Sequence, residues 1–135
     1  MHRRYVACLA PNGKLAASTK ETPMAHQLNQ SCITACYTCA TACNHCAASC
    51  LLEKDVQMMA KCIANDIDCA EMCAFAAAAM ARGSKHAAAI CTLCADICQS
   101  CADECKKHAM DHCQACAKAC LDCVKACRAM SSAQV

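Results

Sequence analysis

The cysteines of this chain recur at the spacing of one face of an α-helix. Nineteen of its 20 cysteines fall between residues 32 and 127, and most are separated alternately by three and four positions. Side chains at these intervals lie on one face of a helix, where leucine and isoleucine usually form the buried stripe. Here the predicted buried stripes are made of sulfur: Cys32, Cys36, Cys39, Cys43, Cys46 and Cys50; Cys62, Cys69 and Cys73; Cys91, Cys94, Cys98, Cys101 and Cys105; and Cys113, Cys116, Cys120, Cys123 and Cys127.

Four helical segments can be drawn through these stripes. We expect helices at about residues 23–51, 54–82, 85–108 and 112–131. Thr22-Pro23 is a good helix start, and Gly83 followed by Ser84 marks a stop and a restart. The phase of the cysteine pattern changes after residue 50, which predicts a turn near residues 52–55.

The start of the last helix has a signal of its own, because Asp111 with Gln114 resembles a capping box. Four amphipathic helices with short connections specify an all-α fold, an antiparallel up-down-up-down four-helix bundle with a cysteine-lined core. We assign residues 23–135 to this bundle and residues 1–22, which include Cys8, to a peripheral N-terminal tail.

Composition argues against nucleic-acid and membrane partners. The formal net charge is +2, and the chain has one Phe, two Tyr and no Trp among scattered lysines and arginines, so it lacks a basic patch with stacking aromatics. No segment approaches the roughly 18 apolar residues of a membrane span. The apolar stretch after Arg4 is shorter than the roughly 7–15 residues of an export signal. We therefore expect a cytoplasmic protein, in which clustered cysteines indicate a metal more often than disulfides.

Several roles for the cysteines have to be weighed. A purely structural core would be better built from leucine, since cysteine buries less area. Disulfides within a helix are disfavoured because Cβ atoms three or four residues apart are roughly 5–6 Å from each other, whereas a disulfide needs about 3.5–4.5 Å; pairs across the core stay possible. A thiol redox protein needs one low-pKa cysteine with a resolving partner, and the pattern singles out no such pair.

Among metals, iron–sulfur clusters use discrete sets of four cysteines, which continuous stripes do not provide. A metallothionein-like zinc or cadmium buffer remains an alternative, although zinc with four thiolates leaves two negative charges at every site. Copper(I) is soft, selects thiolate and thioether ligands and tolerates low coordination numbers. One Cu⁺ for each thiolate also leaves the core neutral.

Copper(I) therefore suits the stripes best. Two cysteines three or four residues apart can clasp one ion nearly linearly, and bridging thiolates would give a capacity on the order of 15–20 ions per chain. The sequence predicts a non-catalytic protein that stores or buffers Cu(I), with the nineteen cysteines of the stripes as ligands.

The pattern also resembles a known family. From Cys32 to Cys50 the spacing is Cys-x3-Cys-x2-Cys-x3-Cys-x2-Cys-x3-Cys, and residues 108–120 read H-A-M-D-H-C-Q-A-C-A-K-A-C. Both features resemble the bacterial copper storage proteins, and the expected cytoplasmic location makes the chain similar to their cytosolic branch. The resemblance implies a four-helix bundle filled with Cu(I) along its axis and assembled as a homotetramer.

Histidine and methionine continue the stripes at the end of the predicted bundle that gathers the first and third turns. His108 lies three residues after Cys105, and Met110 lies three residues before Cys113. Imidazole and thioether groups are plausible weak ligands for an ion that passes inward. The candidate ligands at this end are His108, His112, Met58 and Met110.

Other positions leave two interpretations open. Met80 and Met130, at the opposite end, either plug the bundle with thioether groups or simply pack the core. Asn65 and Asp66 stand where the second stripe requires a cysteine. Either Asp66 faces solvent with Asn65 at the boundary, or a buried polar residue here hydrogen-bonds the sulfurs. His45 falls between stripe positions and is expected to point outward.

Overall fold

The computed structural model describes residues 23–133, with side chains from residue 27 onward. The predicted tail with Cys8 lies outside the described residues. The regular structure in the described part is entirely helical: α1 (Pro23–Cys50), a short 3-10 helix η1 (Val56–Met59), α2 (Ala60–Ala81), α3 (Ala87–Cys105) and α4 (Asp111–Ala133). None of these helices is long and apolar enough to cross a bilayer. The predicted all-α fold is confirmed.

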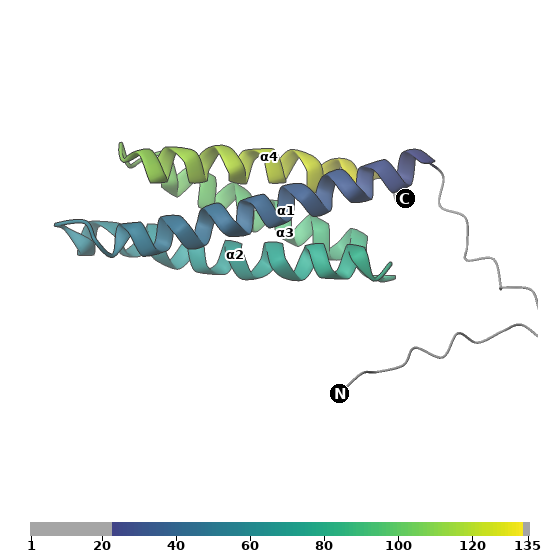
Figure 1. Ribbon diagram of the computed structural model, residues 1–135, viewed down its shortest axis with the longest axis horizontal. Coiled ribbons are helices and arrows are strands. Elements are labelled where there is room, and N and C mark those ends of the chain that lie inside the picture. Colours follow the sequence, from purple (N-terminus) through teal and green to yellow (C-terminus); the bar gives the residue numbers. More distant parts are fainter. Residues whose placement is uncertain (1–22, 134–135) are drawn as a thin grey trace, which may run out of the picture.

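The four long helices run alternately up and down in an elongated bundle (Figure 1). α1 packs between α2 and α4, and α3 completes the ring between the same two helices. One end holds the α1–α2 and α3–α4 turns, and we call it the double-turn end. The other end holds the α2–α3 turn together with the start of α1 and the end of α4 (Figure 1). This is the predicted antiparallel topology.

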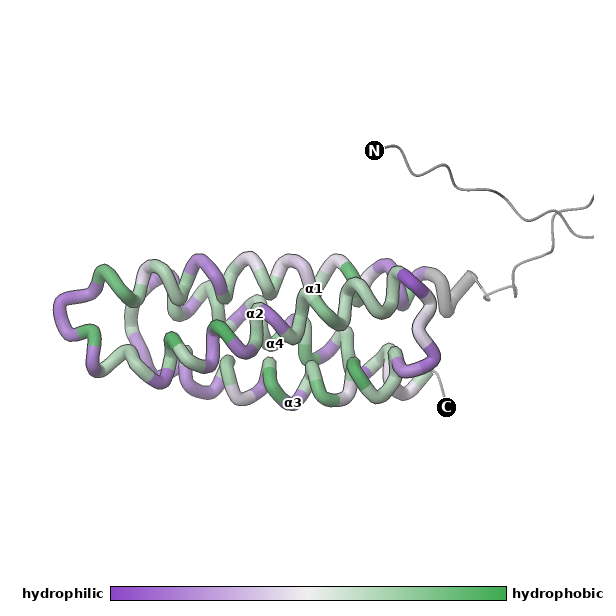
Figure 2. Tube along the Cα trace, turned by 90° about the horizontal axis from the view of Figure 1, so that it is seen from below, coloured by the Kyte–Doolittle hydropathy of each residue, from purple (hydrophilic) through white to green (hydrophobic). Residues whose placement is uncertain are grey.

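Cysteine and alanine fill the inside of the bundle. All nineteen cysteines from residue 32 to residue 127 are fully buried. Alanines on the flanks of the stripes, such as Ala76, Ala95 and Ala102, are buried with them. Along each helix, hydrophobic positions alternate with hydrophilic ones (Figure 2), as expected for amphipathic helices around one core. Small side chains let the helix backbones approach closely, and this brings thiols from different helices together on the axis.

Gly83 ends α2, as the sequence predicts. Its φ is +66°, and its N–H donates to the carbonyl of Met80 at 3.1 Å, while the N–H of Ser84 donates to Ala79 at 3.0 Å. These two bonds form a Schellman motif. The Ser84 hydroxyl then accepts a bond from the amide of His86 at 3.1 Å. Ser84 thus starts the turn before α3, although the helix itself begins two residues later than predicted.

Two predicted helix boundaries are wrong in ways that affect the site. The second helix opens as η1, where Asp55 accepts a hydrogen bond from the amide of Met58 at 3.4 Å. The third helix ends at Cys105 instead of residue 108, because the amides of Lys107 and His108 close tight turns onto carbonyls three residues earlier. A tight turn of this kind has three residues per turn, whereas an α-helix has 3.6. The periodic spacing of the cysteine stripes therefore does not continue to Met58 or His108.

Gln114 supports the start of α4 differently from the predicted capping box. The helix begins at Asp111, and the Gln114 amide donates to the carbonyls of His108 at 2.6 Å and Lys106 at 3.4 Å. In a capping box this side chain would accept a hydrogen bond from the backbone amide of the residue that caps the start of the helix. Gln114 therefore ties α4 to the turn that follows α3.

Candidate metal centre

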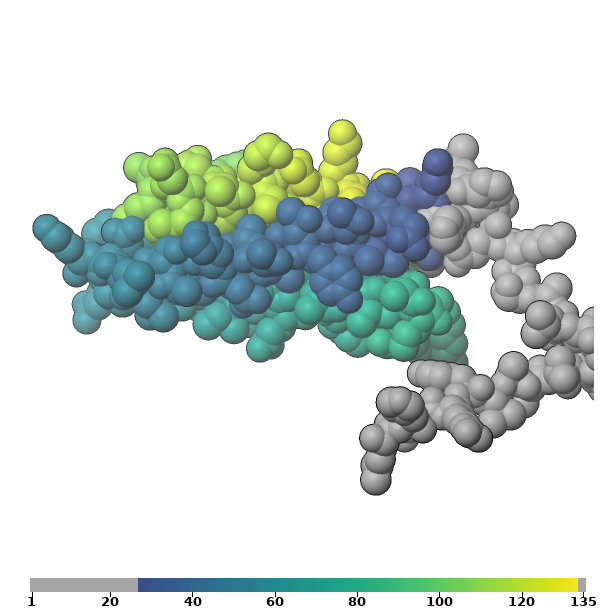
Figure 3. Space-filling model, in the orientation of Figure 1, coloured from purple at the N-terminus to yellow at the C-terminus, as the bar shows by residue number. Residues whose placement is uncertain are grey.

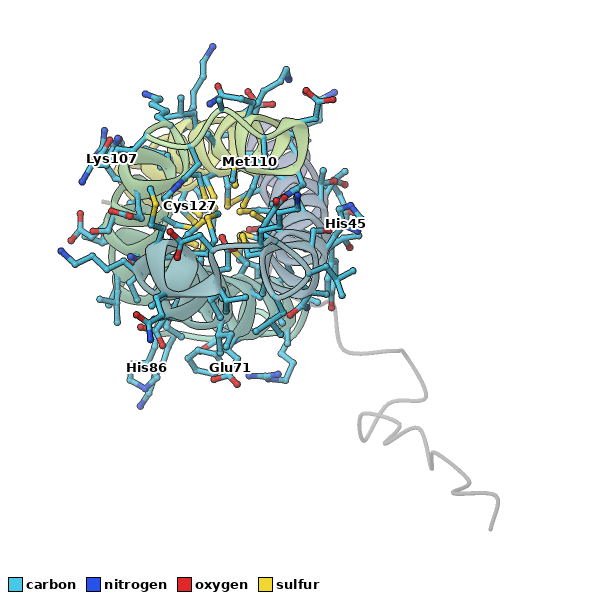
Figure 4. The ribbon with its side chains drawn as sticks, turned by 90° about the vertical axis from the view of Figure 1, so that its left-hand side faces the viewer. His45, Glu71, His86, Lys107, Met110 and Cys127 are labelled. Atoms are coloured by element: carbon cyan, nitrogen blue, oxygen red, sulfur yellow. The ribbon has the colours of Figure 1, made fainter. Side chains whose placement is uncertain are left out.

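The sulfur atoms of the nineteen buried cysteines form a continuous thiol column along the bundle axis. Viewed end-on, sulfur gathers at the centre of the ring of helices, whereas the labelled His45 and Lys107 point outward (Figure 4). Neighbouring Sγ atoms on different helices lie as close as 3.4 Å, at Cys73 and Cys98, and those of Cys43 and Cys101 lie 4.0 Å apart. On the face shown in Figure 3, α1, α2 and α4 close over this column.

Groups of four thiols that could each surround one ion share members along the column. In each group the sulfur atoms all lie within 4.8 Å of one another. Three successive groups are Cys36, Cys94, Cys123 and Cys127; Cys39, Cys73, Cys98 and Cys123; and Cys39, Cys43, Cys69 and Cys120. Because Cys123 and Cys39 each belong to two groups, the arrangement favours bridging thiolates and a chain of ions over separate four-thiolate sites.

The sulfur separations can be compared with those of linear and threefold coordination. With a metal–thiolate bond of about 2.3 Å, the two sulfurs of a linear site lie about 4.6 Å apart and those of a trigonal site about 4.0 Å apart. Pairs four residues apart lie at 3.8 Å for Cys46–Cys50 and 4.0 Å for Cys69–Cys73. These pairs are close to the trigonal separation, and groups of four thiols with sulfurs within 4.8 Å of one another also include the linear separation.

Burial raises the pKa of thiols at the double-turn end of the column. Desolvation penalises a thiolate, and it raises the pKa of Cys113 to about 11 and that of Cys62 still further above its usual range. It also raises the pKa of the Asp66 carboxyl to about 9. A monovalent cation that replaces the proton of such a thiol leaves the charge of the core unchanged.

Asp66 occupies a stripe position of α2 and is fully buried. Its Oδ1 atom lies 3.2 Å from the sulfur of Cys101 and 3.3 Å from that of Cys116, while Oδ2 lies 3.8 Å from Cys62. The interpretation that Asp66 faces solvent is wrong, and the alternative of a buried group bonded to sulfurs is confirmed. The carboxyl tolerates burial because it is protonated and surrounded by thiol donors.

His112 closes the thiol column at the double-turn end. It stands in the first turn of α4, and its Nε2 atom lies 2.9 Å from Oε1 of Glu53. Its Nδ1 atom lies 3.5–3.8 Å from three sulfurs, those of Cys46, Cys113 and Cys50. Together with Cys62 these cysteines form another group of four thiols. One imidazole and four thiols therefore converge where the column meets the turns.

Within the described residues, no hydrogen bond joins the other three candidate ligands at this end to a thiol. His108 pairs its Nε2 atom with Oε1 of Glu104 at 3.3 Å. Met58 is 67% exposed, and Met59 is buried instead. Met110 is partly buried against the edge of the core. Ligand roles for His108, Met58 and Met110 therefore remain predictions.

At the opposite end of the column the buried side chains are those of methionine and alanine, together with Asn29, which lies three residues before Cys32. Met80 and Met130 are each 2% exposed, and Ala76, Ala77 and Ala87 are buried beside them. Both methionines belong to the same buried cluster as the cysteines. The two ends therefore differ, since an imidazole lies against the sulfurs at one end, whereas buried methionine, alanine and Asn29 lie at the other.

The fold and the site define a class of protein: a four-helix bundle whose interior is a set of ligands for soft metal ions. The sequence model of the copper storage proteins matches residues 25–132 of this chain. The chain belongs to the copper storage protein family, which confirms the resemblance seen in the cysteine spacing.

Solved structures and a curated relative agree with this membership. The Cu(I)-bound copper storage protein BsCsp3 is 50% identical, with a TM-score of 0.75 over 78% of this chain and 99% of that one. A cytosolic copper storage protein from Streptomyces lividans, with five coppers, is 36% identical, with a TM-score of 0.80 over 82% of this chain and 98% of that one. The uncharacterized cysteine-rich protein YhjQ of Bacillus subtilis is 49% identical over 79 residues, which cover 58% of this chain and 73% of that protein.

Proposed function

We propose that this protein stores and buffers Cu(I) in the cytoplasm by binding many ions to the thiolates inside its bundle. The continuous column of nineteen buried thiols carries this proposal. Soft Cu(I) accepts bridging thiolates and low coordination numbers, which is what overlapping groups of sulfurs offer. The similar Streptomyces lividans protein is a cytosolic copper storage protein, which supports the proposed location.

The role is non-catalytic. The nineteen cysteines between residues 32 and 127 are all free thiols, and all are buried alike, so no single pair stands out as a redox centre. We propose these cysteines as the copper ligands, with His112 as an additional ligand at the double-turn end. His108, Met58 and Met110 would make only transient contacts with ions that pass inward.

Competition between metals tests the assignment. Reduced protein is first loaded with zinc, then titrated anaerobically with Cu(I), and the metal content is measured after desalting. We expect Cu(I) to displace all zinc, because thiolate ligands select the softer ion. Zinc that stays bound in the presence of excess Cu(I) would instead indicate a buffer for divalent ions.

We also propose that the chain assembles as a homotetramer. Its helix α1 supports this, because the 28 residues from Pro23 to Cys50 include no Asp, Glu, Lys or Arg. On the outer side of α1, Tyr37 is 50% exposed and lines a shallow hollow with Thr38 and Thr41. Interface cores are poor in charge and rich in tyrosine, so this uncharged face suits a second copy of the chain.

Light scattering coupled to size exclusion measures the assembly directly. We expect a mass close to four chains of 14.2 kDa for the wild type and smaller species for Tyr37→Lys, since burying an unpaired ammonium group is costly. A monomeric wild type would contradict the tetramer. A tetrameric Tyr37→Lys variant would place the interface on another face.

A further inference from the structure

Glu53 links the first turn of the bundle to the copper ligand set. It lies after α1, where its amide donates to the carbonyl of Cys50 at 3.2 Å. Its side chain is 33% exposed and reaches the less exposed His112, with 2.9 Å between Oε1 and Nε2. Glu53 therefore stands between solvent and the imidazole that closes the thiol column.

This contact determines which nitrogen of His112 faces the sulfurs. An ionised carboxylate only accepts hydrogen bonds, so Nε2 carries the proton. In a neutral imidazole the other nitrogen then presents a lone pair. That nitrogen, Nδ1, lies 3.5 Å from the sulfurs of Cys46 and Cys113. The free lone pair and the thiols thus point at the same space.

We propose that Glu53 is the positioning residue of the copper uptake site, which consists of His112 with Cys46, Cys50 and Cys113. It holds the imidazole so that Nδ1 and the thiols bind an incoming Cu(I) ion together. A carboxylate behind a histidine ligand fixes its tautomer and ring orientation and increases its basicity. This inference rests on the Cu(I) storage function proposed above.

The second histidine at this end shows that a contact between a histidine and a carboxylate does not by itself define the site. His108 is paired with Glu104 at 3.3 Å, a geometry similar to that of the His112 pair. Within residues 23–133, however, the side chain of His108 has Glu104 as its partner and no thiol. Only the His112 pair directs its second ring nitrogen at the thiol column.

Rates of anaerobic Cu(I) loading, followed by stopped-flow absorbance, test the positioning role. We expect Glu53→Leu to slow loading by about 10-fold while the final capacity is kept. Glu53→Gln keeps an acceptor oxygen and should load nearly as fast as the wild type. Because Glu53 acts through His112, adding Glu53→Leu to His112→Ala should cause no further slowing. Asp103→Leu is the control, since it removes an exposed carboxylate near the same end whose partner is Gln99.

A measurement on the metal-free protein reports the contact itself. In ¹H–¹⁵N spectra we expect the Nε2 proton of His112 to be visible and protected from exchange in the wild type and in Asp103→Leu. The signal should be lost in Glu53→Leu, while circular dichroism shows an unchanged helical content. A protected Nε2 proton in Glu53→Leu would overturn the proposal.

The kinetic outcomes also separate the possible failures. If Glu53→Gln loads as slowly as Glu53→Leu, or if Glu53→Leu slows the His112→Ala variant further, Glu53 acts through its charge and the positioning role is wrong. A wild-type loading rate in Glu53→Leu overturns it as well. A wild type that binds only a few Cu(I) ions would refute the storage function itself, whatever the variants do.

Discussion

At the scale of single residues, burial decides the charge of the groups inside the bundle. The Asp66 carboxyl is the clearest case, because desolvation raises its pKa from 3.8 to about 9. Thiols from three helices surround it, among them Cys62, Cys101 and Cys116. A neutral carboxyl with thiol neighbours adds no charge to the column at this position. Because the Asp66 carboxyl is protonated in the folded state, the free energy of unfolding of the metal-free protein should depend on pH.

The sign of that coupling can be tested. Between about pH 4 and pH 9 the folded state keeps a proton on Asp66 that the unfolded state has lost, so the free energy of unfolding falls as pH rises through this window. Asp66→Asn is similar in shape and does not titrate. We expect it to be more stable than the wild type at neutral pH, with a difference that grows with pH. Urea unfolding of the reduced, metal-free proteins measures this, and a pH-independent difference would contradict it.

The two histidines at the double-turn end should differ in their effect on loading. His112 lies against three thiols, whereas His108 is paired with Glu104. We expect the double replacement by alanine to slow Cu(I) loading while leaving capacity nearly intact, with most of the slowing reproduced by His112→Ala alone. Stopped-flow loading of both single variants and the double variant measures this. An unchanged rate in the double variant would reject an uptake role for either histidine.

At the scale of helices and turns, the spacing of residues along the sequence predicts which side chains lie inside the bundle. It does not predict which side chains meet at the ends of the bundle. A periodicity of three and four is a property of the α-helical backbone, so the burial of Cys32 or Cys127 could be predicted from the sequence. The 3-10 helix η1 and the turn after Cys105 have a different period, which places Met59 inward instead of Met58 and takes His108 off the stripe. The contact between Glu53 and His112 joins residues 59 positions apart, so no local signal reveals it.

The turn between α2 and α3 offers a test at this scale. Gly83 has a φ of +66°, and a Cβ atom added to it would have no heavy atom within 4 Å beyond those of Gly83 and its two chain neighbours. Replacing it by alanine should therefore cost only backbone strain, about 1–2 kcal/mol, and Gly83→Asn should cost less because asparagine tolerates this conformation. Thermal unfolding of the metal-free variants measures both. Equal stability of Gly83→Ala and the wild type would contradict the left-handed turn.

At the scale of the whole molecule, the core and the binding site are the same set of side chains. The buried residues are mainly cysteine and alanine, with Met59, Met80, Met130 and Val124 as the larger apolar groups. Such a core buries little area per residue, so the metal-free bundle should be only modestly stable. Copper bridges between thiolates would connect all four helices.

Loading should therefore stabilise the fold strongly, because an ion that binds only the folded state shifts the unfolding equilibrium. We expect a large rise in the thermal midpoint on loading, and its reversal when a strong Cu(I) chelator removes the metal. Calorimetry of both forms in reducing buffer measures this. Equal midpoints would mean that copper does not bridge the helices.

The stoichiometry of anaerobic Cu(I) binding to the fully reduced protein tests the central claim most directly. If the whole thiol column is the store, binding should saturate well above about ten ions per chain, approaching one per buried thiol. Saturation at about one to four ions per chain would contradict storage, and it would reduce the column to a few discrete sites within an otherwise structural core.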